Sequence, residues 1–143
     1  MDHFGHHPYV NTRFRVEVDG MRSTGATEVI LPEARIVGEP GKGCVTQYGN
    51  MTIRRGLTDS SEWYDWWDRN RSAKTLQKRN IAVVLINDHG GDAHQWTFLD
   101  VSPMAYILST LNALGSEIVI ETLELTVRGF NARFVGASNP KTP

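Results

Sequence analysis

The hydrophobic residues of this chain follow the two-residue period of a β-strand along most of its length and take a helical period in one stretch, Leu57–Arg71. There, Trp63, Trp66 and Trp67 are spaced i, i+3 and i+4, which places three indoles on one face of a helix over about residues 60–70. One helix cannot cover two sheets on its own. The sequence therefore predicts a mainly β fold, in which two packed sheets form a small barrel with one flanking α-helix.

The ends of this helix also have a sequence signature. Asp59 is predicted to be the N-cap, and Glu62, three residues later, completes a capping box. Glu62, Asp65 and Asp68 lie on the face opposite the indoles, so this face is expected to point outward. The three Trp residues are interpreted as a packing anchor rather than a ligand site, since aromatic residues at helical spacing are usually core.

Composition excludes several classes of function. The formal net charge of −1 gives no reason to expect nucleic acid or an anionic membrane as a partner. The longest apolar run, Ile81–Ile86, is far too short to span a membrane, and it predicts a strand covered on both faces. No signal segment is recognised at the start, and Cys44 is the single cysteine, so we expect cytoplasmic synthesis without a disulfide. Release from the cell by another route stays open.

Several strands are predicted from alternating apolar residues. Two of them change phase, which moves the apolar residues to the other face of the strand. Pro32 accounts for the first change by a bulge or bend, and a bulge near Thr122 is predicted for the second. The expected strands are 13–19, 24–37 with the bend at Pro32, 51–57, 81–86, 95–108 with an interruption at 102–103, and 117–130 with the bulge; 87–92 is a hairpin turn.

The remaining segments lack periodicity. Gly38–Asn50 is the longest of them and is rich in glycine, and so long a connection in a small β domain indicates a functional loop or disorder. The basic stretch Arg69–Arg79 has no interleaved aromatic residues and is interpreted as a solvated loop rather than a nucleic-acid site. Residues 1–10 are expected to form a flexible arm and residues 136–143 a loose tail.

No catalytic motif is present: we find no metalloprotease, nucleophile-elbow, phosphate-loop or dinucleotide-binding pattern. Histidines 3, 6 and 7 fall in the arm, and histidines 89 and 94 flank a hairpin turn, without the spacing of a structured metal site. Accordingly no catalytic residue, cofactor or metal is predicted. The unexplained feature is apolar strand surface, which favours copies of the same chain as partners.

Taken together, six segments make the chain resemble the inner-tube proteins of contractile phage tails, and most of all the tubes of extracellular contractile injection systems. The resemblance covers about residues 8–134. It is carried by the order and spacing of 9–20 (YVNTRFRVEVDG), 25–33 (GATEVILPE), 53–57 (IRRGL), 62–68 (EWYDWWD), 112–117 (NALGSE) and 120–125 (IETLEL).

This resemblance implies a single tail-tube domain over residues 1–143 with an Hcp-like β-barrel fold and no enzymatic activity. Such subunits form hexameric rings that stack into a hollow tube inside a contractile sheath, and strands of neighbouring subunits join into one barrel around the channel. The implied partners are further copies of the chain, the sheath, baseplate and tube-terminator proteins, and cargo in the lumen. Such a tube is driven through a target membrane, and the single subunit is not expected to insert stably into one.

Interface residues are expected from the same resemblance and from the apolar strands. The helix residues Glu62, Asp65 and Asp68 would face the sheath or a neighbouring subunit. A lateral β-interface is predicted at Ile118, Ile120, Leu123 and Leu125. Ring stacking is predicted at Pro8, Tyr9, Val10, Asn11, Gly38, Pro40, Gly41, Lys42, Gly43 and Tyr48.

A different class of function is left open by the sequence. A monomeric small β-barrel would bind a ligand in its interior, with the Trp cluster or Cys44 near the mouth. That alternative predicts a single particle of 16.0 kDa with a defined pocket, whereas the tube interpretation predicts rings or tubes in negative-stain images.

Overall fold

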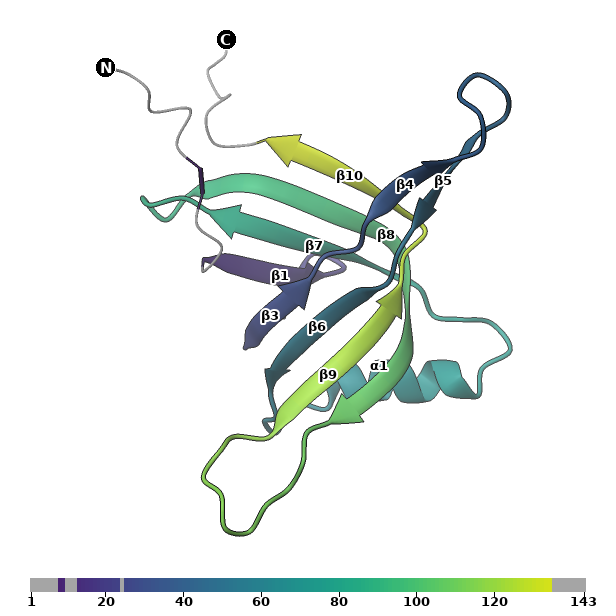
Figure 1. Ribbon diagram of the computed structural model, residues 1–143. Helices are drawn as coiled ribbons and strands as arrows, with labels where there is room; N and C mark the ends of the chain where they lie inside the picture. The colour runs from purple at the N-terminus through teal and green to yellow at the C-terminus, as the bar shows by residue number, and fades with distance from the viewer. Residues whose placement is uncertain (1–7, 10–12, 24, 135–143) are drawn as a thin grey trace.

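The computed structural model describes residues 8–9, 13–23 and 25–134 of the 143-residue chain. Within these residues the chain forms ten strands and one helix, and the strands are antiparallel wherever they pair (Figure 1). In chain order the elements are β1 (Phe14–Val18), β2 (Met21–Ser23), β3 (Ala26–Ile30), β4 (Ala34–Val37), β5 (Val45–Tyr48), β6 (Met51–Gly56), α1 (Glu62–Arg71), β7 (Arg79–Ile86), β8 (Asp92–Leu108), β9 (Ile120–Thr126) and β10 (Gly129–Phe134).

The long strand β8 belongs to two sheets and thereby joins them. Its first part lies between β7 and β10 in sheet A, whose strand order is β2-β1-β7-β8-β10. Its last part, from Ser102 onward, pairs with β9 in sheet B, whose order is β8-β9-β6-β3. Asp100 adopts a left-handed φ of 52° where the strand passes from one sheet to the other, a conformation that Asp tolerates better than most residues.

The core lies between the two sheets and α1, which runs behind sheet B in Figure 1. All three layers contribute to it, and Trp63 and Trp66 of the helix are each only 1% exposed. The anchor role predicted for the indoles is therefore confirmed for these two, while Trp67 is only half-buried. The buried cluster consists of Val16, Val18, Met51, Ile53, Trp63, Trp66, Ile81, Val83, Phe98, Val101, Leu123, Leu125 and Val127.

The predicted fold class is confirmed: the chain is mainly β, with two sheets and one helix. The bend at Pro32 separates β3 from β4, and the turn between β7 and β8 falls at residues 87–91 as expected. Strand β7 is buried on both faces over residues 81–84. In a single subunit the barrel is open, because β3 is paired only with β6 among the described residues.

The start of the helix differs from the prediction. The N-cap is Ser61, not Asp59, and it makes no side-chain capping bond. Its hydroxyl donates to the Asp65 carboxylate at 2.7 Å. Instead, Ser60 Oγ accepts a long bond from the backbone N–H of Glu62 at 3.4 Å. The Glu62 side chain is turned toward the protein interior, so the predicted capping box is wrong.

The last predicted strand is also different. It is two strands, β9 and β10, separated at Val127–Arg128. No bulge occurs near Thr122, because the pairing of β9 with β6 continues without a shift from Ile120 to Leu125. The irregularity lies in the partner strand β8, between Pro103 and Ala105. The apparent phase change arises because Glu121 is a charged residue on the buried face.

Part of the predicted long loop is in fact regular structure, since Val45–Tyr48 form strand β5. β4 and β5 form a two-stranded hairpin that pairs Ala34 with Tyr48 and Val37 with Val45, and the aperiodic loop is reduced to residues 38–44. The hairpin extends away from both sheets (Figure 1). The tail at 136–143 and residues 1–7 and 10 of the predicted arm lie outside the described residues.

Candidate assembly interface

Sheet B has two free edges, one at each side. Among the described residues, β3 pairs only with β6, and the part of β8 after Val101 pairs only with β9. Both edges carry exposed apolar side chains, Ile30 on β3 and Ile107 on β8. On the β8 edge, the indole N–H of Trp67 donates to the Met104 carbonyl at 3.2 Å. An unpaired strand edge with apolar side chains is a template for pairing with another chain.

The register of sheet B defines a solvent-facing side. One row across the four strands joins Glu28, Arg54, Thr122 and Ile107, and the next row includes Glu124. These positions alternate along their strands with core residues such as Ile53 and Leu123, so they lie on the face opposite the core, where Thr122 is the one that is only 7% exposed. Glu28 and Arg54 form an ion pair on this face. The open side of sheet B is therefore mostly polar, whereas its edges are apolar.

The face of sheet B under the helix contains a buried ionic network that sequence reasoning missed. Arg55 Nε donates to Glu121 Oε1 at 2.8 Å, and both side chains are at most 2% exposed. The guanidinium lies 4.2 Å from the ring centre of Trp63 and 3.4 Å from Glu62 Oε1. Tyr106 donates its hydroxyl to the other Glu121 oxygen at 2.5 Å. Burial and this bond raise the pKa of Tyr106 to about 12.

This network fixes the helix on sheet B and explains the position of Glu62. That residue was expected to face outward, but its carboxylate approaches Arg55 and accepts a bond from Ser23 at 3.3 Å. Asp65 and Asp68 are half-exposed and bonded to Ser61 and Arg71 within or next to the helix. Of the three predicted outward residues, these two are left for contact with a neighbour.

The four residues predicted for a lateral interface fall into two groups. Leu123 and Leu125 are fully buried in the subunit's own core, so their side chains are not accessible to a second copy. Ile118 is exposed and Ile120 is half-buried, and both lie at the start of β9. The edge residues of β3 and β8 were not predicted, because a free edge depends on strand order, which periodicity does not contain.

The residues predicted for ring stacking lie mainly on the β4–β5 hairpin. Every residue of β4 is exposed, and Ile36 retains 67% of its surface. Gly38 needs its φ of 104°, and an added Cβ there would lie 3.2 Å from the Cys44 backbone. Tyr48 at the base is half-buried and packs edge-on against Phe130. The other predicted hairpin residues, Pro40, Gly41, Lys42 and Gly43, form the exposed connection.

The N-terminal residues predicted for stacking are only partly described. Pro8 and Tyr9 are exposed, and the Tyr9 ring packs edge-on against His94 at 5.6 Å. Val10 and Asn11 lie outside the described residues.

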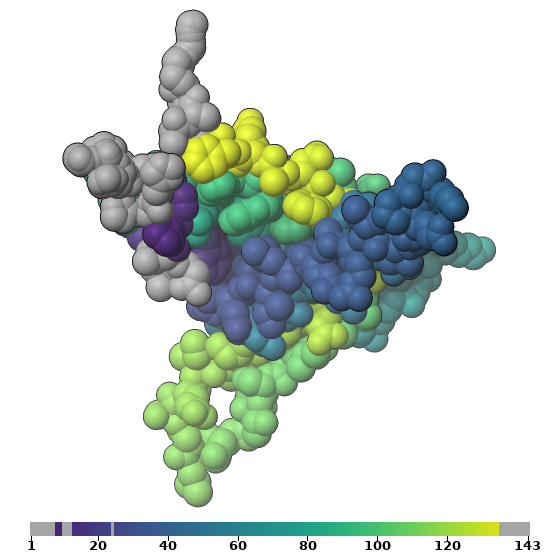
Figure 2. Space-filling model, turned by 45° about the horizontal axis from the view of Figure 1, so that its top comes forward, coloured from purple at the N-terminus to yellow at the C-terminus, as the bar shows by residue number. Residues whose placement is uncertain are grey.

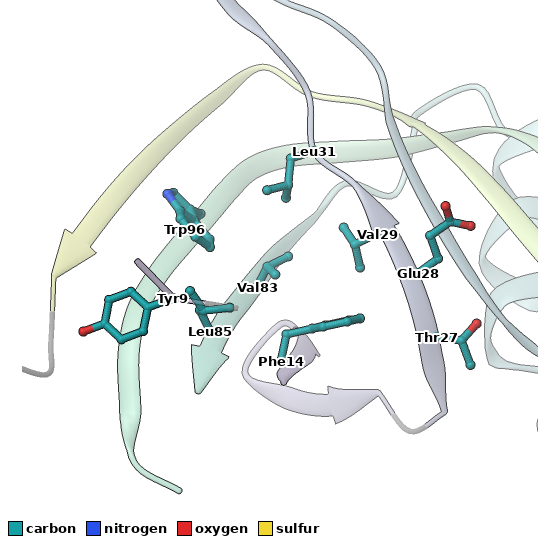
Figure 3. A pocket seen from close by; sticks show the side chains of 9 residues that line it. All are labelled: Tyr9, Phe14, Thr27, Glu28, Val29, Leu31, Val83, Leu85 and Trp96. Carbon is teal, nitrogen blue, oxygen red and sulfur yellow. The ribbon is translucent and has the colours of Figure 1, made fainter. Parts of the chain in front are cut away.

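A groove of about 380 Å³ opens between β3 and sheet A (Figure 3). Phe14, Val29 and Val83 gather around it, with Leu31 and Trp96 at its rim. The three Trp residues of α1 and Cys44 do not line it. The ligand-binding barrel considered above placed its pocket beside those residues, so this groove does not favour that alternative.

The described part of the chain contains no group of three or more His, Cys, Asp or Glu side chains that could hold a metal ion. Its helix is too short and too polar to cross a membrane.

Comparison with known proteins identifies the family. The model of the T4-like virus tail tube protein gp19 family matches residues 10–131. The chain belongs to this family. The match spans both sheets, the helix and the hairpin, so the tail tube family accounts for nearly all of the described structure. The predicted function as a structural tube protomer of a contractile system is therefore confirmed. No curated protein matches the sequence.

Solved structures share the fold at low sequence identity. A chain of the six-fold symmetrised baseplate of the anti-feeding prophage (AFP) has a TM-score of 0.69 and 20% identity, covering 91% of this chain and 98% of that one. A chain of the PVC sheath–tube complex, an extracellular contractile injection system in its extended state, has a TM-score of 0.70 and 18% identity, covering 91% and 94%. Hcp1 from Flavobacterium johnsoniae has a TM-score of 0.62 and 16% identity, covering 83% and 93%. The tail tube chain thus has an Hcp-like fold.

Proposed function

We propose that this chain assembles into hexameric rings that stack into the hollow inner tube of a contractile injection system or phage tail, and that it has no catalytic role. The observation that carries the proposal is the pair of free, apolar edges of sheet B. One edge of a sheet can pair with the other edge of the next copy, so the contact is heterologous and closes into a ring. Six-fold symmetry of the similar AFP baseplate supports the ring size.

In this arrangement β3 of one subunit lies beside the C-terminal part of β8 of the next subunit. The rows of sheet B place Ile30 and Ile107 on the same face, so these two exposed side chains become neighbours across the junction. Joining sheet B of each subunit to the next removes both free edges of sheet B and gives a closed barrel. Ile118 and Ile120, at the end of sheet B where Gly56 pairs with Ile120, would extend the lateral contact.

The position of the helix determines which face of the barrel lines the channel. Helix α1 and sheet A cover one face of sheet B, so a ring closed with the helix outside turns the polar face of Thr122 and Glu124 toward the lumen. Asp65 and Asp68 then face the sheath side. The hairpin residues 38–48 and the N-terminal residues 8–11 contact the next ring. The similar PVC structure is a sheath–tube complex, which supports a sheath as partner.

Further partners follow from the similar structures and remain part of the proposal. The AFP neighbour belongs to a baseplate, and other similar chains belong to a tube-terminating cap and a sheath/tube terminator. We propose that this tube binds the corresponding baseplate and terminator proteins and carries cargo in its lumen. Assembly would take place in the cytoplasm, before any release of the particle.

A single substitution tests the lateral junction. Ile107→Asp places a charge at the β8 edge, where Ile107 is 44% exposed in one subunit, and it should abolish rings in negative-stain images and in native mass spectra. Leu76→Asp is the matched control, since Leu76 is 45% exposed in the loop after α1 and belongs to neither edge strand. The control should form normal rings. A wild-type protein that stays a 16.0 kDa monomer at high concentration would contradict the proposal.

A further inference from the structure

Two apolar projections leave sheet B at opposite ends. The β4–β5 hairpin connects β3 to β6 at the end where Met51 pairs with Leu125. The loop of residues 109–119 connects β8 to β9 at the other end, where Gly56 pairs with Ile120. The six residues of β6 separate the two ends by roughly 17–20 Å. Figures 1 and 2 show the blue hairpin and the green loop extending away from the body in different directions.

The β8–β9 loop has defined internal bonds. Asn112 forms a turn, in which its side-chain oxygen accepts the Leu114 N–H at 3.0 Å and its carbonyl accepts the Gly115 N–H at 3.0 Å. At the base, Ser109 and Ile120 exchange two bonds, at 3.0 and 2.8 Å. The turn holds Leu114 at the tip with 97% of its surface exposed, and Leu111 beside it is 79% exposed. An ordered loop with two leucines in water is typical of a contact surface.

The hairpin at the other end presents a complementary apolar surface. Val37 and Val45 are directly opposite each other in the β4–β5 pair and therefore share a face, while Ile36, which pairs with Thr46, is exposed on the other face. The charged residues that flank these side chains are paired: Lys42 lies 3.5 Å from Glu39, and Arg35 lies 3.1 Å from Glu33. The hairpin thus offers apolar area without an uncompensated charge beside it.

We propose that the β8–β9 loop is the second half of the axial contact, and that Leu111 and Leu114 of one subunit pack on Val37 and Val45 of a second copy in the adjacent ring. The occupant is a second copy because the two projections lie at opposite ends of one subunit and cannot meet within it. Stacking identical rings in the same orientation brings opposite ends together, which is the heterologous contact that builds a filament. This inference rests on the proposed ring and tube function.

The native cysteine makes the contact testable. Cys44 precedes Val45 in the hairpin and is the single cysteine of the chain. In a Leu114→Cys variant, each subunit carries one thiol at either end, so a short bismaleimide should link subunits of successive rings into a ladder on a denaturing gel. Lys74→Cys, in the loop after α1, is the matched control and should give no ladder. Leu114→Cys combined with Cys44→Ser should also give none.

The outcomes separate this contact from the proposed function. A Leu111→Ser/Leu114→Ser variant should still form rings but lose long tubes in negative-stain images. Tubes of normal length from that variant, or wild-type-like tubes of Leu114→Cys without a Cys44-dependent ladder, would overturn the loop contact and leave the ring proposal intact. A cross-linked dimer that forms from Leu114→Cys without Cys44 would indicate a loop–loop contact and would also overturn it. Absence of rings from the unmodified protein would overturn the proposed function itself.

Discussion

The network under α1 and the two projections of sheet B depart from the usual distribution of polar and apolar residues in opposite ways. Under the helix, the charged side chains of Arg55 and Glu121 are buried. On the projections, large apolar side chains such as Ile36 and Leu114 are in water. The burial of charge is compensated within the subunit, because Arg55 and Tyr106 both donate hydrogen bonds to the Glu121 carboxylate. The exposure of apolar side chains on the projections has no such compensation within the described part of one subunit.

This difference separates folding from assembly. Buried charges that are paired and hydrogen-bonded destabilise a fold strongly when one partner is removed. Exposed apolar residues contribute little to the stability of the subunit that carries them, but they drive association with another subunit. Substitutions under the helix should therefore lower the free energy of unfolding, whereas substitutions on the projections should leave it unchanged and reduce stacking.

The largest effect is expected for Glu121→Ala. The substitution removes the buried carboxylate that accepts from the Arg55 guanidinium at 2.8 Å, and it should reduce the free energy of unfolding by about 3–5 kcal/mol. Urea unfolding followed by circular dichroism, at several protein concentrations, measures this change, because assembly makes apparent stability concentration-dependent.

The control for that substitution lies three residues along the same strand. Glu124 is on the opposite, polar face of β9, so Glu124→Ala should change the free energy of unfolding by no more than about 0.5 kcal/mol. Equal effects of the two substitutions would contradict the view that the buried pair holds the helix on the sheet.

A smaller effect is expected for Tyr106→Phe. The ring is retained, and its contacts with Tyr64 and Trp67 are expected to remain, but the bond to Glu121 is lost and a buried carboxylate oxygen is left without that donor. We expect a loss of about 1–3 kcal/mol. The same urea titration measures it, and a variant as stable as the wild type would show that the hydroxyl contributes nothing to the network.

The raised pKa of Tyr106 makes the free energy of unfolding decrease at high pH. A value of about 12 in the folded chain is above the ordinary value of about 10. The folded state therefore keeps its proton where the unfolded state loses it, and the resulting stabilisation is complete below about pH 10 and is lost as the pH rises toward 12. Wild-type stability should fall more steeply than that of Tyr106→Phe over this interval. If the free energies of unfolding of the wild type and Tyr106→Phe decrease in parallel between about pH 10 and 12, the Tyr106 hydroxyl does not contribute to this pH dependence.

Sequence reasoning succeeded where a single face of an element is buried. The strand at 14–18 and the helix were predictable because Val16, Val18, Trp63 and Trp66 repeat at the period of their element and all pack into the core. The bend at Pro32 was predictable because proline cannot donate to a strand ladder.

The sequence-based predictions that were wrong or missing concern the network under α1, the β4–β5 hairpin and the edges of sheet B, and each has a physical cause. The phase change of the apolar residues led to a predicted bulge that β9 does not have, because the charged Glu121 occupies a position on the buried face. Its partner Arg55 lies 66 positions away in the sequence. The strand Val45–Tyr48 was missed because neither face of the hairpin is buried along its length, so no alternation develops. The free edges of sheet B follow from strand order, which no local pattern encodes.

The smallest effect on the fold, and a large effect on assembly, is expected for Ile36→Ser/Val45→Ser. Both side chains are exposed on a hairpin that packs on neither sheet along most of its length, so the free energy of unfolding should change by no more than about 0.5 kcal/mol. Rings should persist, because the edges of sheet B are untouched, while tubes measured in negative-stain images should shorten. Thr46→Ala, directly opposite Ile36 in the same hairpin, is the control and should give tubes of normal length. A drop in stability comparable to that of Glu121→Ala would mean that the hairpin belongs to the fold rather than to the assembly, and full-length tubes would mean that the apolar side chains of Ile36 and Val45 are not used in stacking.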